Sequence, residues 1–287
     1  MEETSRTGWH PLLCDPIGER EPRQSGGTSG TAVHGERGKT MVIDKGLGLH
    51  AFSDLIATSG DYIDCIKLGF GTSTLYDEEL LTSKIRLARS RGIRIMPGGT
   101  LLEAAIRHGV TSSFLEQVCK LGYDTIEVSD GTIEISRQTR TELIRQGLAQ
   151  GLFVYTEYGK KAAGFRIDLE MLAATAYADW TAGAELVSIE ARESGVGVGL
   201  FDHNGQCNDN ELEQIRSRFA DLDGFMWEAP LRHQQLALLR SLGFNVHLGN
   251  IQPADVLTLE AMRRGLRSDT FPLEAAEVQE EAFYYMI

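Results

Sequence analysis

The chain has few cysteines, no surplus of basic residues and no long hydrophobic run. Its 287 residues include four cysteines, which are scattered and form no CxxC pair, so we expect reduced thiols and neither a disulfide framework nor a zinc site. A formal net charge of −13 argues against nucleic acid or an anionic membrane as a partner, because both bind basic surfaces. No apolar run approaches the roughly 20 residues of a membrane span, and the N-terminus does not resemble a signal peptide. Together these absences predict a cytoplasmic protein.

Glycines divide most of the chain into units of similar length. Each of seven glycines ends a helix-like segment and precedes an apolar, strand-like run, at spacings mostly near the roughly thirty residues of a βα unit. The expected strands are Met41–Lys45, Tyr62–Leu68, Arg94–Pro97, Thr125–Ser129, Phe153–Tyr158, Leu186–Ala191, Phe225–Glu228 and Val246–Asn250. Eight strands alternating with helices predict a single-domain α/β protein with a (β/α)8 TIM barrel. A doubly wound open sheet is the alternative.

The ends of the chain do not follow this pattern. Residues 1–39 contain a linker-like Ser25–Thr31 stretch and predict a flexible N-terminal arm. Alternatively, the arm wraps over the barrel or over a neighbouring subunit. The barrel then covers residues 40–271, and residues 272–287 form a C-terminal tail.

Four successive strands carry a glutamate at or near their ends: Glu127, Glu157, Glu190 and Glu228. Burying a carboxylate without a partner is costly, so repetition on consecutive strands predicts one shared polar site. Strand parity directs these glutamates into the barrel near its C-terminal mouth, where barrel enzymes keep their chemistry. Such a site suits a metal ion or an anionic intermediate. A salt bridge with a neighbouring lysine remains the alternative for any one of them.

Cations and glycine-rich turns follow several of the other strands. Lys45, Lys67 and Arg192 lie at strand ends, and Lys160 and Lys161 follow the fifth strand. On an acidic protein this gathering predicts a small anionic substrate. The turn that holds Gly99 would let backbone N–H groups approach an oxyanion. Lys160 and Lys161 also fit an ordinary exposed pair.

Several motifs occur in an order typical of one family. They are Thr40–Gly48, Gly60–Asp64 followed by Lys67, Pro97–Leu101, Glu157 with Gly159–Lys161, Glu190–Gly195, Glu228–Pro230 and Leu266–Phe271. Over about residues 40–271 the chain resembles the phosphosulfolactate synthases. It departs from the family at Phe70, where Trp is frequent, and at His247, where Asn is frequent. We expect both positions near the mouth, where they would bear on the choice of nucleophile.

The resemblance implies a magnesium-dependent addition of sulfite to phosphoenolpyruvate, which gives (2R)-2-phospho-3-sulfolactate. This reaction opens a route to coenzyme M in archaea and feeds sulfolactate production in bacteria. We also expect a homo-oligomer. Two alternatives remain: a barrel that adds another nucleophile to an enol phosphate, and a non-catalytic, heat-stress-associated barrel like some plant relatives.

The family match also suggests roles for individual residues. Lys161 is the expected general acid, with a pKa lowered by its cationic neighbours. Glu157, Glu190 and then Glu127 are the expected metal ligands, and their oxygen atoms favour Mg²⁺ over zinc. Lys45 and Arg192 are expected to act beside Lys161 by holding the anionic groups. The expected substrate-binding residues are Lys67, Gly99, Thr100, Ser129, Ser194 and Asn250.

Overall fold

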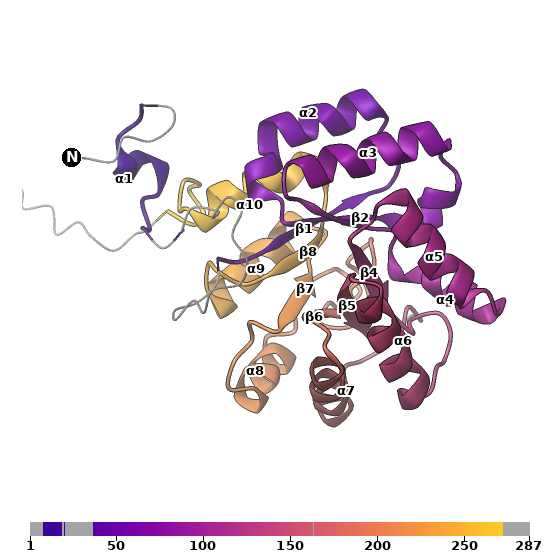
Figure 1. Cartoon of the computed structure of the whole chain (residues 1–287). Helices are drawn as coiled ribbons and strands as arrows, with labels where there is room; N and C mark the ends of the chain where they lie inside the picture. The colour runs from indigo at the N-terminus through magenta and orange to yellow at the C-terminus, as the bar shows by residue number, and fades with distance from the viewer. Residues whose placement is uncertain (1–7, 19, 21–36, 163, 272–287) are drawn as a thin grey trace, which may run out of the picture.

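In the computed structural model, eight parallel strands form the centre of the molecule and helices surround them (Figure 1). The structure describes residues 8–18, 20, 37–162 and 164–271. The strands are β1 Thr40–Asp44, β2 Cys65–Leu68, β3 Arg94–Met96, β4 Thr125–Val128, β5 Phe153–Tyr158, β6 Leu186–Ile189, β7 Phe225–Glu228 and β8 Leu248–Ile251. Each of the eight predicted strands is present, with bounds that differ by up to three residues.

The strand order is that of a barrel. Hydrogen-bonded neighbours run β3-β2-β1-β8-β7-β6-β5-β4, so strands pair with their neighbours in sequence and the first pairs with the last. β3 and β4 are the two ends of this order, and a side chain links them: the Ile95 amide donates to Asp124 Oδ1 at 3.0 Å. The predicted (β/α)8 barrel is confirmed, and the doubly wound alternative is wrong.

The helices follow the strands and form the outer ring of Figure 1. Their bounds are α2 Leu49–Ser59, α3 Glu78–Ser90, α4 Gly99–Arg107, α5 Thr111–Leu121, α6 Arg137–Ala149, α7 Leu169–Ala182, α8 Asp209–Arg218, α9 Arg232–Leu242 and α10 Val256–Arg263. Short 3₁₀ helices η1 Gly60–Tyr62, η2 Gly69–Thr74 and η3 Pro253–Asp255 join them. Local chemistry sets several ends: Ser136, Asp168 and Asn208 cap α6, α7 and α8 with side-chain oxygens.

Side chains alternate between two cores along each strand. The outward residues pack against the helices, among them Ile126 and Val128 of β4. The inward residues fill the lower barrel with a small apolar cluster made of Met41, Cys65, Met96, Tyr155, Leu186 and Met226. One layer higher, four strands carry a charged residue at the inward position: Lys67, Glu127, Glu157 and Glu228. The apolar floor therefore places the charged layer at the C-terminal ends of the strands, called the mouth below.

The described part of the predicted N-terminal arm contacts the barrel. The short helix α1, Pro11–Cys14, lies outside the ring of helices on the side of α10 (Figure 1). Arg20 is buried and forms a bidentate ion pair with Glu260 of α10, with its closest N–O distance at 3.0 Å. Arg20 therefore lies against the barrel, and both the flexible arm and the wrapped arm remain predictions for residues 1–39. The predicted tail, residues 272–287, lies outside the described residues.

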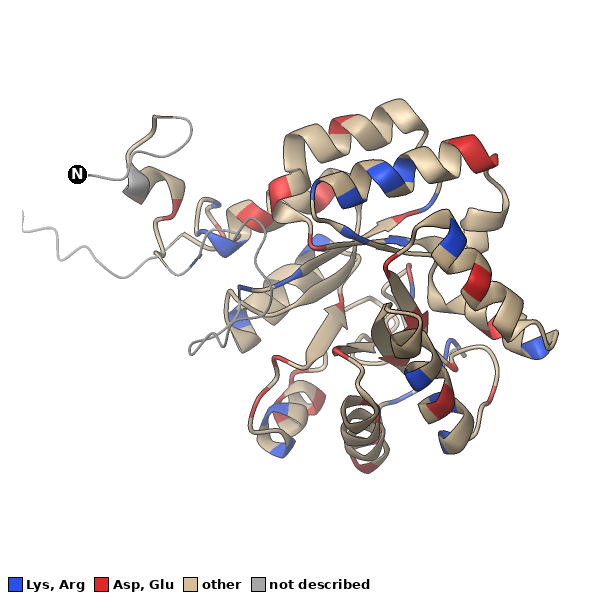
Figure 2. Ribbon diagram, viewed as in Figure 1, with Lys and Arg blue, Asp and Glu red and all other residues tan. Residues whose placement is uncertain are grey.

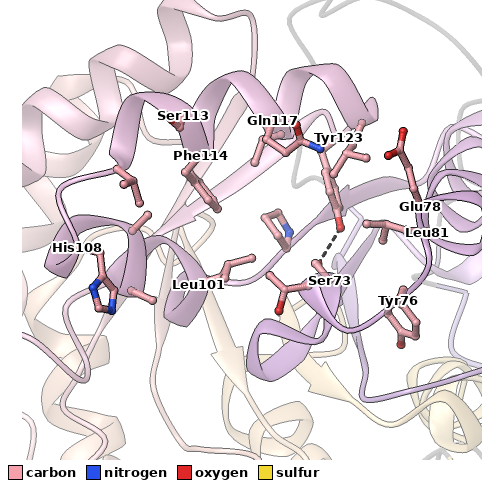
Figure 3. Close-up of a pocket in the computed structure, with 17 residues that line it drawn as sticks. Ser73, Tyr76, Glu78, Leu81, Leu101, His108, Ser113, Phe114, Gln117 and Tyr123 are labelled. Carbon is pink, nitrogen blue, oxygen red and sulfur yellow. Dashed lines mark hydrogen bonds between the residues drawn. The ribbon is translucent and has the colours of Figure 1, made fainter.

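A large apolar cavity lies outside the barrel, between η2, α3, α4 and α5 (Figure 3). Its volume is about 580 Å³, and its walls include Leu81, Leu101 and Phe114. Its polar side chains include Ser73, whose hydroxyl lies 2.8 Å from the Tyr123 hydroxyl. It holds none of the strand-end charged residues. Within the described ranges, no helix is both long and apolar enough to cross a membrane.

Candidate active site

Charged side chains from several strands converge at the mouth. On the outer helices, basic and acidic residues are interspersed (Figure 2). Lys67 of β2, Glu127 of β4, Glu157 of β5 and Glu228 of β7 are buried at inward positions, and Glu190 directly follows β6. They line a small cavity of about 50 Å³, called the mouth cavity. The full lining is Ile43, Lys67, Gly69, Phe70, Gly98, Gly99, Thr100, Glu127, Glu157, Lys161, Glu190, Arg192, Glu193, Glu228 and Asn250.

Lys67 lies between three of the glutamates. Its Nζ is 2.9 Å from Glu228 Oε1, 3.1 Å from Glu127 Oε2 and 3.8 Å from Glu157 Oε2. Burial alone would lower the pKa of this ammonium, but the three carboxylates outweigh burial and raise it. Lys67 is therefore a fixed positive charge at the centre of the site.

Lys161 brings a second ammonium from the loop after β5. Its Nζ is 2.7 Å from Glu157 Oε1 and 3.0 Å from Glu190 Oε2. Burial would lower the pKa of Lys161, but the same glutamates outweigh burial and raise it. The expectation that cationic neighbours lower this pKa is therefore wrong: the neighbours of Lys161 are carboxylates, and the ammonium of Lys160 turns away to Asp130 at 2.9 Å.

The mouth has more carboxyl groups than cations. Four glutamates face the ammoniums of Lys67 and Lys161. The excess shows in Glu190, whose pKa rises to about 10 because burial and the charges of Glu157 and Glu228 outweigh Lys161. The pKa of Glu157 falls to about 2, because the attraction of both lysines outweighs its burial. Among the described residues, oxygens of Glu157, Glu190 and Glu228 lie within 4.8 Å of one another, close enough to share a metal ion.

The turn before α4 brings backbone donors to the cavity. The amide of Gly99 donates to Glu127 Oε1 at 2.8 Å. A Cβ on Gly99 would lie 2.3 Å from Ser129 Oγ and 2.8 Å from Glu127 Oε1, so only glycine fits there. Gly98 has φ +77, a left-handed conformation that glycine adopts without strain. The α4 N-terminus, with Thr100 in its first turn, thus faces the mouth cavity.

Strained backbone gathers at the same place. Three non-glycine residues of the described chain have positive φ: Phe70, Arg192 and Asn250. All three line the mouth cavity. Such conformations cost free energy, especially for Phe and Arg, and they concentrate at functional sites. Asn250 is also buried with no hydrogen-bond partner for its Oδ1, an acceptor suited to a ligand or an ordered water.

The structure brings together most of the predicted site residues. The cavity lining includes Lys67, Gly99, Thr100, Glu127, Glu157, Lys161, Glu190, Arg192 and Asn250. Three others lie outside the lining. Lys45 is exposed in the turn after β1, and Ser194 is exposed in the loop after β6. Ser129 is buried and donates to Glu103 Oε1 at 2.6 Å.

Two features differ from what the sequence suggested. Glu228 lies within the group of carboxylates that could share an ion, whereas Glu127, which was favoured as a ligand, bonds Lys67 and Gly99. The signal for Glu228 was present, because it ends an apolar strand as the other glutamates do. His247 lies just before β8, at the end of the barrel opposite the mouth, where its Nδ1 accepts from the Lys39 amide at 2.9 Å. The expectation that His247 lies near the mouth is therefore wrong.

Solved structures support the fold. The 3-hexulose-6-phosphate synthase of Salmonella typhimurium superposes with a TM-score of 0.50 at 13% identity, covering 79% of this chain and 98% of that chain. At this identity the likeness concerns the fold alone.

Sequence relatives are much closer. The phosphosulfolactate synthase of Methanocaldococcus jannaschii is 40% identical over 238 residues, covering 82% of this chain and 94% of the relative. That of Bacillus subtilis is 35% identical, covering 82% and 93%. The plant protein HEAT-STRESS-ASSOCIATED 32 of Arabidopsis thaliana is 23% identical over 101 residues, about a third of each chain, so it gives little support to the non-catalytic alternative. The family model for (2R)-phospho-3-sulfolactate synthase (ComA) matches residues 33–269. The chain therefore belongs to the phosphosulfolactate synthase family.

Proposed function

We propose that this protein adds sulfite to C3 of phosphoenolpyruvate and protonates C2, giving (2R)-2-phospho-3-sulfolactate. The observation that carries the proposal is the charge arrangement of the mouth: four buried or nearly buried carboxyl groups around two ammoniums, within the family fold. The family supplies the reaction, and the site supplies groups of the required chemistry.

The carboxylates fit a divalent cation. They offer only oxygen ligands, and burial together with the charges of Glu157 and Glu228 raises the pKa of Glu190 in spite of Lys161. Oxygen donors favour Mg²⁺. We propose Glu157, Glu190 and Glu228 as its ligands, with Glu127 retained as the next candidate. When bound, Mg²⁺ would offset the negative charge that develops on the substrate carboxylate and would lower the pKa of Lys161.

The remaining steps belong to the protein's own side chains. Sulfite forms the C–S bond at C3, the C2–C3 double-bond electrons move toward the substrate carboxylate, and C2 then takes one proton. We assign that proton to Lys161, which regains it from solvent. Lys67 and Arg192 would hold anionic groups of the substrates, while the Gly99 turn, Thr100 and Asn250 would position them. Lys45, Ser129 and Ser194 remain predictions, since the residues that line the cavity do not include them.

The experiment is an assay of phosphoenolpyruvate consumption with sulfite and Mg²⁺, with phosphorus NMR of the product. A new phosphorus resonance that forms only when both sulfite and phosphoenolpyruvate are present supports the proposal. Consumption without sulfite points to another nucleophile, and no consumption under any condition removes the catalytic assignment. A cytoplasmic location, a homo-oligomer and a role in coenzyme M or sulfolactate formation stay predictions of the family membership.

A further inference from the structure

A buried arginine outside the mouth cavity contacts strand β5, which precedes the Lys161 loop, and the loop after β4, to which the Lys161 loop is hydrogen-bonded. Arg140 lies on α6, is 3% exposed, and is held by Asp179 of α7. Its Nε lies 3.0 and 2.9 Å from the two carboxylate oxygens, and Nη2 lies 2.7 Å from Oδ2. This bidentate geometry fixes the plane of the guanidinium.

The donors that Asp179 leaves available point toward the site. Nη2 also donates to the backbone carbonyl of Glu157 at 2.9 Å, and Nη1 donates to Asp130 Oδ1 at 3.2 Å. β4 ends at Val128, which pairs with Thr156, so Glu157 lies one residue past the end of that neighbouring strand. The guanidinium supplies a donor at a point where β4 has ended, and it fixes the backbone of a residue that lines the mouth cavity.

The contact to Asp130 reaches Lys161 by a second route. Asp130 accepts from Lys160 Nζ at 2.9 Å through Oδ2 and at 2.7 Å through its own carbonyl. The amide of Lys161 donates to the Gly131 carbonyl at 3.0 Å. The loop after β5 is therefore hydrogen-bonded to the loop after β4 through both Lys160 and Lys161. Arg140 in turn hydrogen-bonds Asp130, the partner of Lys160.

We propose that Arg140 is a positioning residue that sets where the Lys161 ammonium lies relative to Glu157 and the substrate; the inference rests on the proposed function. It acts through two contacts, the Glu157 carbonyl and the Asp130 carboxylate, and touches no substrate itself. Its partner Asp179 matters because it orients the guanidinium. Lys160 contributes by holding its loop, which gives this lysine a role without placing it in the chemistry.

The chain offers a matched control. Arg137, one turn earlier on α6, also pairs with Asp179, at 3.3 Å, but its other hydrogen bond goes to Thr175. Arg137→Lys and Arg140→Lys both keep the charge beside Asp179, and only the second removes the fork that reaches Glu157 and Asp130. Asp130→Asn tests the same route from a partly exposed position, where folding is less at risk.

The first measurement is hydrogen exchange at the Lys161 amide, which needs no turnover. Arg140→Lys should raise its exchange about tenfold, the equivalent of about one hydrogen bond, while Arg137→Lys should leave it unchanged. The second measurement is steady-state kinetics of the three variants. Arg140→Lys should lower kcat about 100-fold, the effect of a small misplacement of a reacting group, with little change in KM and with loss of the single configuration at C2.

The outcomes separate the two proposals. Exchange and kinetics in Arg140→Lys that match Arg137→Lys overturn the positioning role. The positioning role is also overturned if Arg140→Lys lowers kcat but leaves the product configuration at C2 and the exchange rate of the Lys161 amide as in the wild type. Raised exchange of the Lys161 amide in both Arg140→Lys and Asp130→Asn supports the positioning role. It does so even if the wild-type protein shows no turnover with sulfite, because that absence of turnover overturns only the proposed function.

Discussion

Removing the Lys161 ammonium while keeping the length of the side chain, as in Lys161→Met, tests the proton donor directly. If Lys161 delivers the proton to C2, turnover should fall by roughly 100- to 10,000-fold, the usual contribution of a general acid. Lys160→Met is the matched control, because Lys160 bonds Asp130 outside the mouth cavity and its side chain is 34% exposed. The control should keep a far larger share of its turnover.

The same pair of variants should differ in stability. Lys161 lies 2.7 and 3.0 Å from two carboxylates whose side chains are 2% and 1% exposed. Removing one partner of a buried pair costs about 3–5 kcal/mol, and we expect about 3 kcal/mol, because Glu190, with a pKa of about 10, is already protonated near neutral pH and leaves Glu157 as the main charge without this partner. An exposed pair contributes about 0.2–1 kcal/mol, which is the loss expected for Lys160→Met.

Mg²⁺ distinguishes the catalytic loss from the structural one. Added Mg²⁺ should raise the melting temperature of Lys161→Met more than that of the wild type, because no ammonium competes for the carboxylates, yet turnover should stay low. The assays are steady-state kinetics and thermal denaturation with and without Mg²⁺. Near-normal turnover of the folded Lys161→Met protein would refute the reasoning and shift attention to Lys67. Mild and similar losses of turnover in both variants would support the alternative in which neither lysine takes part in the chemistry.

Three further predictions concern the metal, the acid stability and the turn before α4. Chelation should abolish turnover and Mg²⁺ should restore it, whereas full activity in excess chelator would contradict a metal role. The affinity for Mg²⁺ should increase as pH rises toward the Glu190 pKa of about 10, because the metal binds the deprotonated carboxylate. Glu157→Gln or Glu190→Gln should lower the rate roughly 100-fold. Burial, together with nearby cations, lowers the pKa of His247 from 6.5 to about 3. As pH falls, the unfolded chain therefore binds this proton before the folded protein does. The free energy of unfolding should then decrease by up to ~1.4 kcal/mol for each pH unit of acidification between pH 6.5 and pH 3. Chemical denaturation across that range should show a shallower fall for His247→Asn, and equal slopes would remove His247 as the cause. Gly99→Ala should destabilise the protein by about 1–3 kcal/mol and impair turnover, whereas Gly48→Ala, whose Cβ would meet nothing within 4 Å, should do neither.

Sequence periodicity was sufficient for the barrel because the signal is local and repeated. Each apolar run ends at a turn, and a parity of two along each strand separates the residues that face the helices from those that face the axis. The inward direction of Glu127, Glu157 and Glu228 follows from that parity, as does the apolar floor beneath them. Strand ends were less well placed at β2 and β8, because Tyr62 belongs to a 3₁₀ turn and the last pairing continues to Ile251.

Distances across the barrel have no such local signal. Sequence position does not reveal that Lys67 contacts Glu228, 161 residues later, or that Lys161 meets carboxylates rather than other cations. For this reason the direction of the Lys161 pKa shift was mispredicted, and Glu228 was left out of the ligand set. Nothing in the sequence predicted a role for Arg140, because it lies among other polar residues of a helical segment.

The direction of the Lys161 shift bears on how the enzyme would control its proton. With its pKa raised by Glu157 and Glu190, Lys161 holds its proton tightly and is a weak acid while these two glutamates are its partners. Once those carboxylates are engaged by a divalent ion, the groups that raise the pKa are neutralised and the proton becomes easier to give up. A site of this design would deliver its proton readily only after the metal has bound. The pH profile of the assay should therefore move to lower pH as the Mg²⁺ concentration rises, and a profile independent of Mg²⁺ would show that Lys161 is controlled in another way.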